Sequence, residues 1–251
     1  MKTPPANILI TGASSGIGAA LAVEYAARGA ANIFICGRNA ERLAEVAAAA
    51  RAAAAGGRVA MHERTLDVCD AAATRAWIEE CNAAAALNLA VANAGVGTGV
   101  ELEPEIRATF ATNVGGVVNT VLPALDLKIP QIALVSSLTA YHGLPACPAY
   151  SASKACVKAW GAGLRGAVAR DGVNVSVICP GFVRSRITDR NTCPMPFFME
   201  ADKAARIIAR GLAKNKGLIT FPWQMRFAAW LAASLPECVS EKLFASLPSK
   251  Y

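Results

Sequence analysis

Short apolar runs alternate with longer helix-compatible segments from one end of the chain to the other. Seven runs have the character of strands: residues 7–11, 32–36, 58–64, 87–92, 131–136, 174–179 and 217–221. Most of them are continuously apolar, which is typical of parallel strands that are covered on both faces. Helices are predicted between them, near residues 17–28, 40–55, 71–82, 104–126, 149–170 and 201–214. This order predicts an α/β fold with a doubly wound parallel sheet and helices on both faces.

The chain is predicted to form one domain, residues 1–251, because no Pro/Gly/Ser-rich linker divides it. Prolines and the lack of any period predict an irregular loop over residues 182–200, and loops of this length are commonly lids or binding loops. The stretch "PMPFFM" at 194–199 indicates an apolar ligand. Short apolar helices are predicted within residues 223–247.

Composition and charge narrow the classes of protein. Hydrophobic residues make up 54% and charged residues 17% of the sequence, which is typical of a globular protein. No apolar run approaches the roughly 20 residues that cross a bilayer, and we expect no signal peptide. The eight cysteines form no C-x-x-C pair, so we expect reduced thiols, no metal site and a cytoplasmic location. A phosphate-rich cofactor explains part of the net charge of +7 more economically than nucleic acid does.

The predicted first strand runs directly into a glycine-rich turn, "TGASSGIG", at residues 11–18. Gly12, Gly16 and Gly18 allow a tight turn and a close approach of the backbone to a pyrophosphate, which then lies at the positive end of the following helix. A glycine pattern alone is a weak signal, since an ordinary turn can show it. Its position between the first strand and the first helix favours dinucleotide binding.

A second chemical signal is Tyr150, which stands four residues before Lys154 with only small residues between them. Residues four apart lie on one face of a helix, so the phenol and the ammonium point the same way. Taken alone, the pair also fits a solvent-exposed helix face. A nearby ammonium is expected to lower the pKa of the phenol and to make it a competent proton donor and acceptor.

These motifs follow one another in a recognisable order with several others. In sequence they are Gly-x-x-x-Gly-x-Gly, "LDV" with Asp67, "ANAG" at 92–95, "TNVGG" with Asn113, "LVSS" ending at Ser137, Tyr150 with Lys154, and "CPGFVRS" at 179–185. Over about residues 6–190 the chain resembles the short-chain dehydrogenase/reductase family, in its small single-domain branch. Two departures are mild. Ala92 replaces the usual first Asn, and Ser185 keeps the hydroxyl of a frequent Thr.

The resemblance implies a Rossmann-type fold and an oxidoreductase that interconverts a ketone or aldehyde and the matching alcohol by hydride transfer. It implies that Tyr150 delivers the proton and that Lys154 also binds the nicotinamide ribose. It further implies that Ser137 polarises the carbonyl oxygen and that Asn113 holds a water that links the lysine to solvent. The implied cofactor-binding residues are Gly12, Ser14, Ser15, Gly16, Ile17, Gly18, Arg38, Asp67, Val68, Asn93, Ala94, Gly95, Tyr150, Lys154, Pro180, Gly181, Val183 and Ser185.

The end of the predicted second strand, "FICGRN", indicates a preference for NADP(H) over NAD(H). No acidic residue lies between Asn32 and Ala40, where an NAD pocket places a carboxylate against the ribose 2′-hydroxyl. A guanidinium such as that of Arg38 holds a 2′-phosphate by charge-assisted hydrogen bonds. The alternative is that Arg38 simply begins the next helix at the surface, with Asn39 as its N-cap.

Partners and other functions follow from the remaining residues. The family resemblance implies a homodimer or homotetramer that pairs through the helices at 104–126 and 149–170. A non-catalytic dinucleotide-binding regulator is disfavoured by the intact Ser137, Tyr150 and Lys154. A peripheral membrane role rests on a basic stripe and nearby aromatic residues, Lys203, Arg206, Arg210, Lys214, Trp223, Arg226, Phe227 and Trp230. The simpler interpretation is a solvated helix face followed by helices that close the substrate cleft or a subunit interface.

Overall fold

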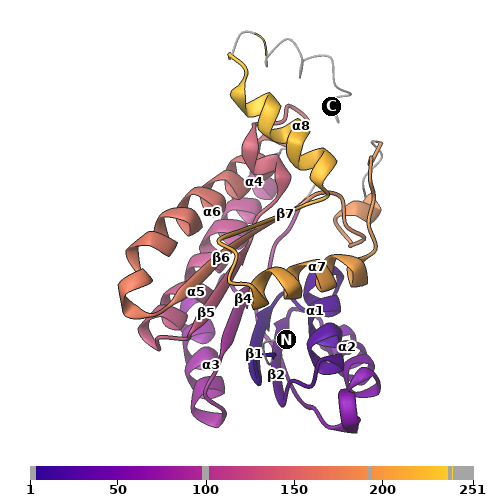
Figure 1. Cartoon of the computed structure of the whole chain (residues 1–251), viewed down its shortest axis with the longest axis vertical. Coiled ribbons are helices and arrows are strands. Elements are labelled where there is room, and N and C mark those ends of the chain that lie inside the picture. Colours follow the sequence, from indigo (N-terminus) through magenta and orange to yellow (C-terminus); the bar gives the residue numbers. More distant parts are fainter. Residues whose placement is uncertain (1–3, 98–101, 191–193, 237–238, 240–251) are drawn as a thin grey trace.

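The computed structural model describes residues 4–97, 102–190, 194–236 and 239. Within these ranges the chain forms a seven-stranded parallel sheet in the order β3-β2-β1-β4-β5-β6-β7 (Figure 1). The strands are β1 (Asn7–Thr11), β2 (Asn32–Gly37), β3 (Ala60–Thr65), β4 (Leu89–Ala92), β5 (Gln131–Val135), β6 (Asn174–Pro180) and β7 (Leu218–Phe221). The strand order reverses between β1 and β4. The predicted doubly wound parallel sheet is confirmed.

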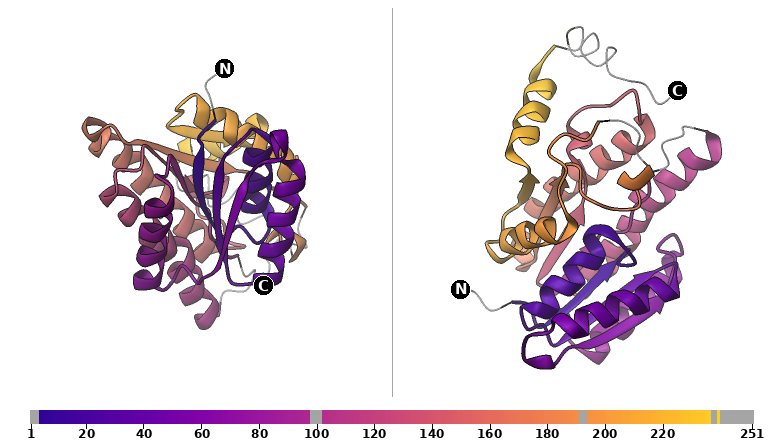
Figure 2. Two further views of the ribbon diagram at one scale, coloured as in Figure 1. Left: turned by 90° about the horizontal axis from the view of Figure 1, so that it is seen from below. Right: turned by 90° about the vertical axis from the view of Figure 1, so that its right-hand side faces the viewer.

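Helices cover both faces of the sheet (Figure 2). One face carries α1 (Gly16–Ala27), α2 (Ala40–Ala53) and α7 (Ala201–Ala213), and the other carries α3 (Ala71–Ala84), α5 (Gly116–Asp126) and α6 (Pro148–Ala167). The chain adds α4 (Glu103–Phe110) before α5, the short turn η3 (Leu138–Tyr141) after β5, and α8 (Trp223–Ser234) after β7. Within the described residues, no helix has both the length and the apolar character needed to span a membrane.

Most of the strands are largely apolar because each of their faces packs against a helix layer, whereas the edge strand β3 is mostly polar and exposed. In β1, Ile8 and Ile10 point into the core cluster beneath α1, α2 and α7. Leu9, between them, points into the cluster beneath α3, α5 and α6. Successive side chains of a strand alternate between faces, so a central strand needs hydrophobic residues at every position.

The predicted elements agree with the structure in kind and order, their ends differ by a few residues, and two of the differences have a clear structural cause. The helix predicted over 104–126 contains a π-helical turn, η2 (Ala111–Gly115), between α4 and α5. The strand predicted to start at 58 starts at Ala60 instead, because Gly56 and Gly57 adopt φ values of +68° and +69° and turn the chain just before it.

The loop predicted over residues 182–200 is anchored at its base. Val183 and Met199 form a parallel β-bridge, and Arg184 N donates to Met199 O at 2.9 Å. The guanidinium of Arg184 also donates two hydrogen bonds to the carboxylate of Glu200, at 2.7 and 3.0 Å. Residues 191–193 of this loop lie outside the described residues, as does the predicted helical region beyond Pro236 apart from Val239.

The close packing of α6 on the sheet can be tested at Gly161. A Cβ atom at this position would lie 2.6 Å from Cγ2 of Val177 and 3.3 Å from Cδ2 of Leu134. We expect Gly161→Ala to lower the free energy of unfolding by about 1–2 kcal/mol, because these buried side chains cannot move aside without strain. On the same helix, Gly163→Ala meets no atom within 4 Å. It should raise the free energy of unfolding by about 0.5–1 kcal/mol, because Ala is the better helix former.

Urea unfolding of the two variants measures both changes. A Gly161→Ala variant that is as stable as Gly163→Ala would contradict the close packing of α6 on β5 and β6.

Candidate active site

The glycine-rich turn joins β1 to α1 at the carboxyl edge of the sheet, beside the point where the strand order reverses. Gly12 and Gly16 have φ values of +66° and +58°, in the left-handed region that favours glycine. A Cβ atom on Gly12 would lie 2.5 Å from Cα of Ala94, and one on Gly16 would lie 2.9 Å from Cβ of Ser185. The turn therefore packs directly against the segments that follow β4 and β6, so three predicted motifs meet here.

Hydrogen bonds between Thr11 and Asn93 join the ends of β1 and β4. The hydroxyl of Thr11 accepts from the main-chain N–H groups of Asn93 at 3.1 Å and Ala94 at 3.3 Å. The side-chain amide of Asn93 donates to the carbonyl oxygens of Thr11 and Gly12, both at 3.0 Å. Asn93 thus holds the glycine-rich turn in place. Thr11 is a positioning residue that the sequence did not single out, because a threonine at the end of a strand carries no pattern of its own.

The amino end of α1 fits a phosphate group. Ser15 is the N-cap residue, its side chain makes no capping hydrogen bond, and the first turn of the helix contains no acidic residue. The first main-chain N–H groups of the helix therefore remain available to an anion. A Cβ atom on Gly18 would lie 2.7 Å from the carbonyl oxygen of Gly12, so the third glycine allows helix and turn to pack. Ser14 and Ile17 belong to the same turn and stand half-buried beside it.

Arg38 and Asp67 come together from the ends of β2 and β3. Nη1 of Arg38 lies 3.9 Å from Oδ2 of Asp67, and both side chains are largely exposed. Oδ1 of Asp67 accepts from the main-chain N–H of Cys69 at 3.0 Å, which fixes the turn after β3, and Val68 in this turn is buried. Asn39 caps α2 through its side chain. The prediction that Asn39 is the N-cap of the helix after Arg38 is therefore confirmed. Arg38 itself lies just before this helix, at the carboxyl edge of the sheet.

Tyr150 and Lys154 project from the first turns of α6 towards the end of β5. Ser137 follows β5, and its side chain is hydrogen bonded to the phenol of Tyr150. Nζ of Lys154 lies 5.7 Å from the centre of the tyrosine ring. The structure therefore brings the predicted hydroxyl, phenol and ammonium groups into one cluster at the carboxyl edge of the sheet.

Lys154 is a buried cation, with only 3% of its surface exposed. Its Nζ donates to the carbonyl oxygen of Val135 at 3.1 Å, and the hydroxyl of Ser136 donates to the carbonyl oxygen of Lys154 at 2.7 Å. A Cβ atom on Gly95 would lie only 3.2 Å from this Nζ. Burial lowers the pKa of Lys154 to about 8, because the uncharged amine loses less on leaving water than the ammonium does.

Asn113 lies in the π-helical turn η2, where the wider helix lets a side chain reach the neighbouring loop. Its Oδ1 accepts from Val96 N at 2.7 Å, and its Nδ2 donates to Val96 O at 2.9 Å and to Ser153 Oγ at 3.0 Å. All of these partners belong to the protein. The side chain of Asn113 therefore ties the loop after β4 to α6, a structural role that the sequence did not reveal.

The expectation that Lys154 lowers the pKa of Tyr150 is wrong for this structure. Burial raises the pKa of Tyr150 to about 12, the nearby Cys147 adds to the rise, and the hydrogen bond from Ser137 opposes it. The physical reason is burial, which disfavours the charged phenolate and also the charged form of the lysine, whose ammonium lies over the tyrosine ring, 5.7 Å from its centre.

The segment after β6 holds the remaining predicted cofactor residues. β6 ends at Pro180, and Val183 is buried in the core cluster that includes α1. A Cβ atom on Gly181 would lie 2.8 Å from Sδ of Met225, so this glycine lets α8 approach the end of the sheet. Ser185 reaches the glycine-rich turn, as its contact with Gly16 shows.

Comparison with known proteins assigns the chain to a family. The family model for short chain dehydrogenases matches residues 6–194. An uncharacterized oxidoreductase of Myxococcus xanthus is 40% identical over 237 residues, which cover 91% of this chain and 92% of the relative. An uncharacterized oxidoreductase of Mycobacterium tuberculosis is 30% identical over 227 residues, which cover 86% of this chain and 88% of the relative.

Solved structures share the fold. A short-chain dehydrogenase/reductase from Burkholderia phymatum, in complex with NAD, has a TM-score of 0.81 at 22% identity and matches over 92% of this chain and 94% of its own. A short-chain dehydrogenase from Sphingobium yanoikuyae, in complex with NADPH, has a TM-score of 0.77 at 23% identity over 96% of both chains. Fold, site and relatives together define an NAD(P)-dependent oxidoreductase. The chain belongs to the short-chain dehydrogenase/reductase family.

The burial of Lys154 predicts a specific dependence of stability on pH. Because its pKa falls from 10.5 to about 8 on folding, the folded chain binds this proton less tightly than the unfolded chain. Lys154→Met should therefore raise the free energy of unfolding by about 3 kcal/mol below pH 8. Between pH 8 and pH 10.5 this advantage should disappear, because the unfolded wild type there binds more protons than the folded state and wild-type stability rises with pH.

Urea unfolding of both proteins across this pH range measures the difference between their free energies of unfolding. Taking the difference removes the contribution of the other titrating groups, which both proteins share. A difference that stays constant with pH would contradict the lowered pKa.

Proposed function

We propose that the chain interconverts a ketone or aldehyde and the corresponding alcohol by hydride transfer, with NADP(H) preferred to NAD(H). The observation that carries this proposal is the cluster of Ser137, Tyr150 and Lys154 at the carboxyl edge of the sheet. The cluster shares that edge with a helix terminus that fits a diphosphate. The dinucleotide, when bound, supplies or accepts the hydride.

Tyr150 is the proposed proton carrier. With a pKa near 12 its phenol stays protonated at neutral pH, so it can donate to a carbonyl oxygen that gains negative charge during reduction. The hydroxyl of Ser137 donates a second hydrogen bond to the same oxygen and stabilises that charge. In the oxidative direction the tyrosine must accept a proton as phenolate, a form that is scarce at neutral pH when its pKa is near 12.

Asn113 is proposed to act through its backbone. Its side chain is committed to Val96 and Ser153. We therefore assign the predicted water to its main-chain carbonyl, which lies in a π-helical turn that interrupts the regular α-helical hydrogen-bond pattern.

The proposed cofactor contacts follow the motifs. The turn with Gly12 and Gly16 holds the diphosphate, Asp67 contacts the adenine, Arg38 holds a 2′-phosphate, and Lys154 binds the nicotinamide ribose. The support for this order is that all five residues lie at the carboxyl edge of the sheet, around the point where the strand order reverses.

An apolar substrate is proposed because apolar side chains flank the approach to Tyr150. A Cβ atom on Gly97 would lie 2.9 Å from Cγ2 of Ile187 and 3.5 Å from ring carbons of Tyr150, so Ile187 lies close to the phenol ring. Phe197 and Phe198, in the same loop as Ile187, are exposed. Apolar surroundings of this kind suit a ligand that buries hydrocarbon and presents one oxygen to Ser137 and Tyr150.

Self-association is proposed for the helices named above. Phe110 at the end of α4 and Leu122 on α5 are large apolar side chains that remain exposed, and they support a homodimer or homotetramer that buries this face. A cytoplasmic location stays a prediction.

Tyr150→Phe tests the proton carrier. We expect turnover to fall by at least about a hundredfold, the usual range for loss of a general acid, while NADPH affinity stays close to that of the wild type. The readouts are NADPH consumption with a panel of ketones and aldehydes, and NADPH fluorescence on binding. Tyr141→Phe, which alters a second partly buried tyrosine in η3, is the matched control and should keep its turnover.

Near-normal turnover of Tyr150→Phe would refute the assigned role. A wild type that binds NADPH but reduces no carbonyl in the panel would favour a dinucleotide-binding regulator.

The cofactor preference is tested at Arg38. Hydrogen bonds to charged groups contribute about 1.5–3 kcal/mol, so kcat/KM of the wild type should favour NADPH over NADH by roughly ten- to a hundredfold. Arg38→Asp should lose NADPH activity far more than NADH activity, because a carboxylate repels the 2′-phosphate. The matched control is Arg58→Asp, at an exposed arginine just before β3, which should leave the ratio unchanged. Equal use of both cofactors by the wild type would contradict the assignment.

A further inference from the structure

The outer face of α8 carries three exposed aromatic side chains. Trp223, Phe227 and Trp230 are 73%, 57% and 55% exposed. Their spacing of four and three residues places them on one side of the helix, and the ring centres of Phe227 and Trp230 lie 6.0 Å apart. Large apolar side chains that gather in one exposed patch mark a surface that meets an apolar partner.

The inner face of α8 is already occupied. Met225 and Ala229 pack against the core cluster of Leu138 and Cys179, and Ala232 is buried. In Figure 1 the helix lies across one end of the molecule, beyond β7. Because the inner face fixes the rotation of the helix, the three aromatic side chains stay directed away from the core.

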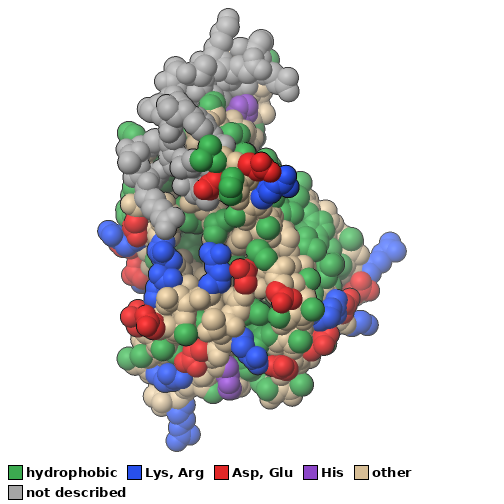
Figure 3. Space-filling view, turned by 180° about the vertical axis from the view of Figure 1, so that it is seen from behind, with side chains coloured by type: hydrophobic (Ala, Val, Ile, Leu, Met, Phe, Trp, Pro, Cys, Tyr) green, Lys and Arg blue, Asp and Glu red, His purple; other side chains and the backbone are tan. Residues whose placement is uncertain are grey.

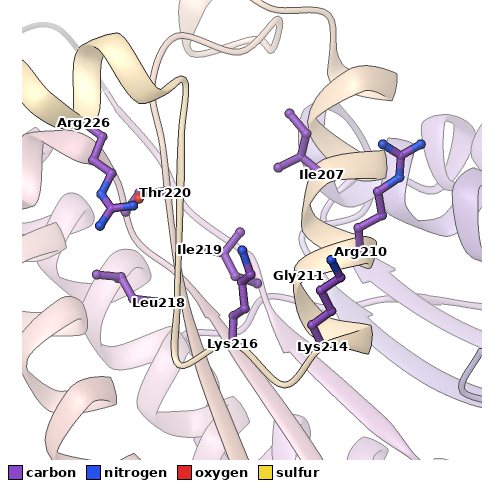
Figure 4. A pocket seen from close by; sticks show the side chains of 9 residues that line it. All are labelled: Ile207, Arg210, Gly211, Lys214, Lys216, Leu218, Ile219, Thr220 and Arg226. Atoms are coloured by element: carbon purple, nitrogen blue, oxygen red, sulfur yellow. The ribbon is translucent and has the colours of Figure 1, made fainter. Parts of the chain in front are cut away.

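A basic groove borders the same helix. It is a cavity of about 220 Å³ lined by Ile207, Arg210, Gly211, Lys214, Lys216, Leu218, Ile219, Thr220 and Arg226. Figure 4 shows Arg226 extending from α8 on one side, and Arg210 on α7 with Lys214 at the C-cap of that helix on the other, with β7 between them. Four of these lining residues are cationic and none is acidic, so the groove concentrates positive charge next to the aromatic face.

The four cations of the groove form no ion pair with any residue that the structure describes. The neighbouring Arg206, on the same α7, instead pairs with Asp202 at 2.9 Å. On the opposite side of the molecule, Figure 3 shows acidic and basic side chains interspersed over the surface. The uncompensated charge of the groove is therefore a local feature and not a general property of the surface.

We propose that the outer face of α8 and the basic groove beside it form a peripheral docking surface for an anionic lipid bilayer. Tryptophan rings settle at the interface between headgroups and acyl chains, and an amphipathic helix lies in that plane with its apolar face inward. Unpaired lysine and arginine side chains at its margin bind anionic headgroups. This inference involves no catalytic step, so it stands independently of the proposed function.

Charge favours a bilayer over a second copy of the chain as the partner. A two-fold contact through α8 places the same surface of both copies together. The two basic grooves would then approach each other, and juxtaposed like charges are unfavourable. An anionic membrane instead supplies the opposite charge at the groove and an apolar layer at the aromatic face.

The test is flotation of the full chain with vesicles of phosphatidylcholine alone and with vesicles of equal parts phosphatidylcholine and phosphatidylserine. We expect binding to the anionic vesicles to be stronger by about tenfold or more, and high salt should abolish this difference. Tryptophan fluorescence should shift to shorter wavelength on binding, because Trp223 and Trp230 enter a less polar environment. Absence of binding to the anionic vesicles, or equal binding to both kinds, would overturn the proposal.

The aromatic component is tested with the double variant Trp223→Ser/Phe227→Ser. It should lose vesicle binding and keep a melting temperature close to that of the wild type, because both side chains are exposed. Wild-type affinity for anionic vesicles in this variant would overturn the proposal. So would unchanged vesicle binding together with a loss of oligomers in light scattering, since the face would then be a subunit interface.

The electrostatic component is tested with Lys214→Gln/Lys216→Gln. This variant should bind anionic vesicles more weakly by on the order of tenfold. The matched control, Arg58→Gln/Arg170→Gln, removes the same number of exposed cations elsewhere on the molecule and should bind like the wild type. An equal loss in both double variants would show that net charge alone drives the binding, and the docking surface would be refuted.

Discussion

An ammonium group buried at the carboxyl edge of the sheet is the constraint on which the site depends. Lys154 can lie there because Gly95 has no Cβ atom to displace it and because Val135 offers a carbonyl oxygen to its Nζ. Burial lowers its pKa to about 8 and raises that of Tyr150 to about 12. The ordinary pKa values of tyrosine and lysine differ only slightly. Burial moves them apart, so that the tyrosine keeps its proton to a higher pH than the lysine does.

The fold supplies the place for this pair through the reversal of strand order between β1 and β4. Two loops leave the sheet in different directions there, and Thr11 and Asn93 tie them together with four hydrogen bonds among the described residues. The same contacts hold Gly12 in its left-handed conformation against Ala94. A small number of buried polar groups thus positions both the glycine-rich turn and the cluster around Tyr150.

Much of this arrangement follows from sequence pattern, and the exceptions have identifiable causes. The strands were predictable because burial on both faces demands continuous apolar runs, and the motif order indicated which side chains meet. The π-helical turn at Asn113 was not predictable, since the surrounding residues keep an ordinary helical pattern. The pKa of Tyr150 depends on burial, which spacing to Lys154 does not reveal. Likewise, the outward direction of Trp223 and Phe227 is set by how the opposite face of α8 packs.

The central claim is tested most directly by measuring the pKa of Lys154 itself. With isotopically labelled lysine, the Cε resonance of this residue can be assigned by its loss in Lys154→Met and followed by NMR as the pH is raised. A buried ammonium predicts a titration midpoint near pH 8. A midpoint near 10.5, the ordinary value for a lysine, would contradict the account.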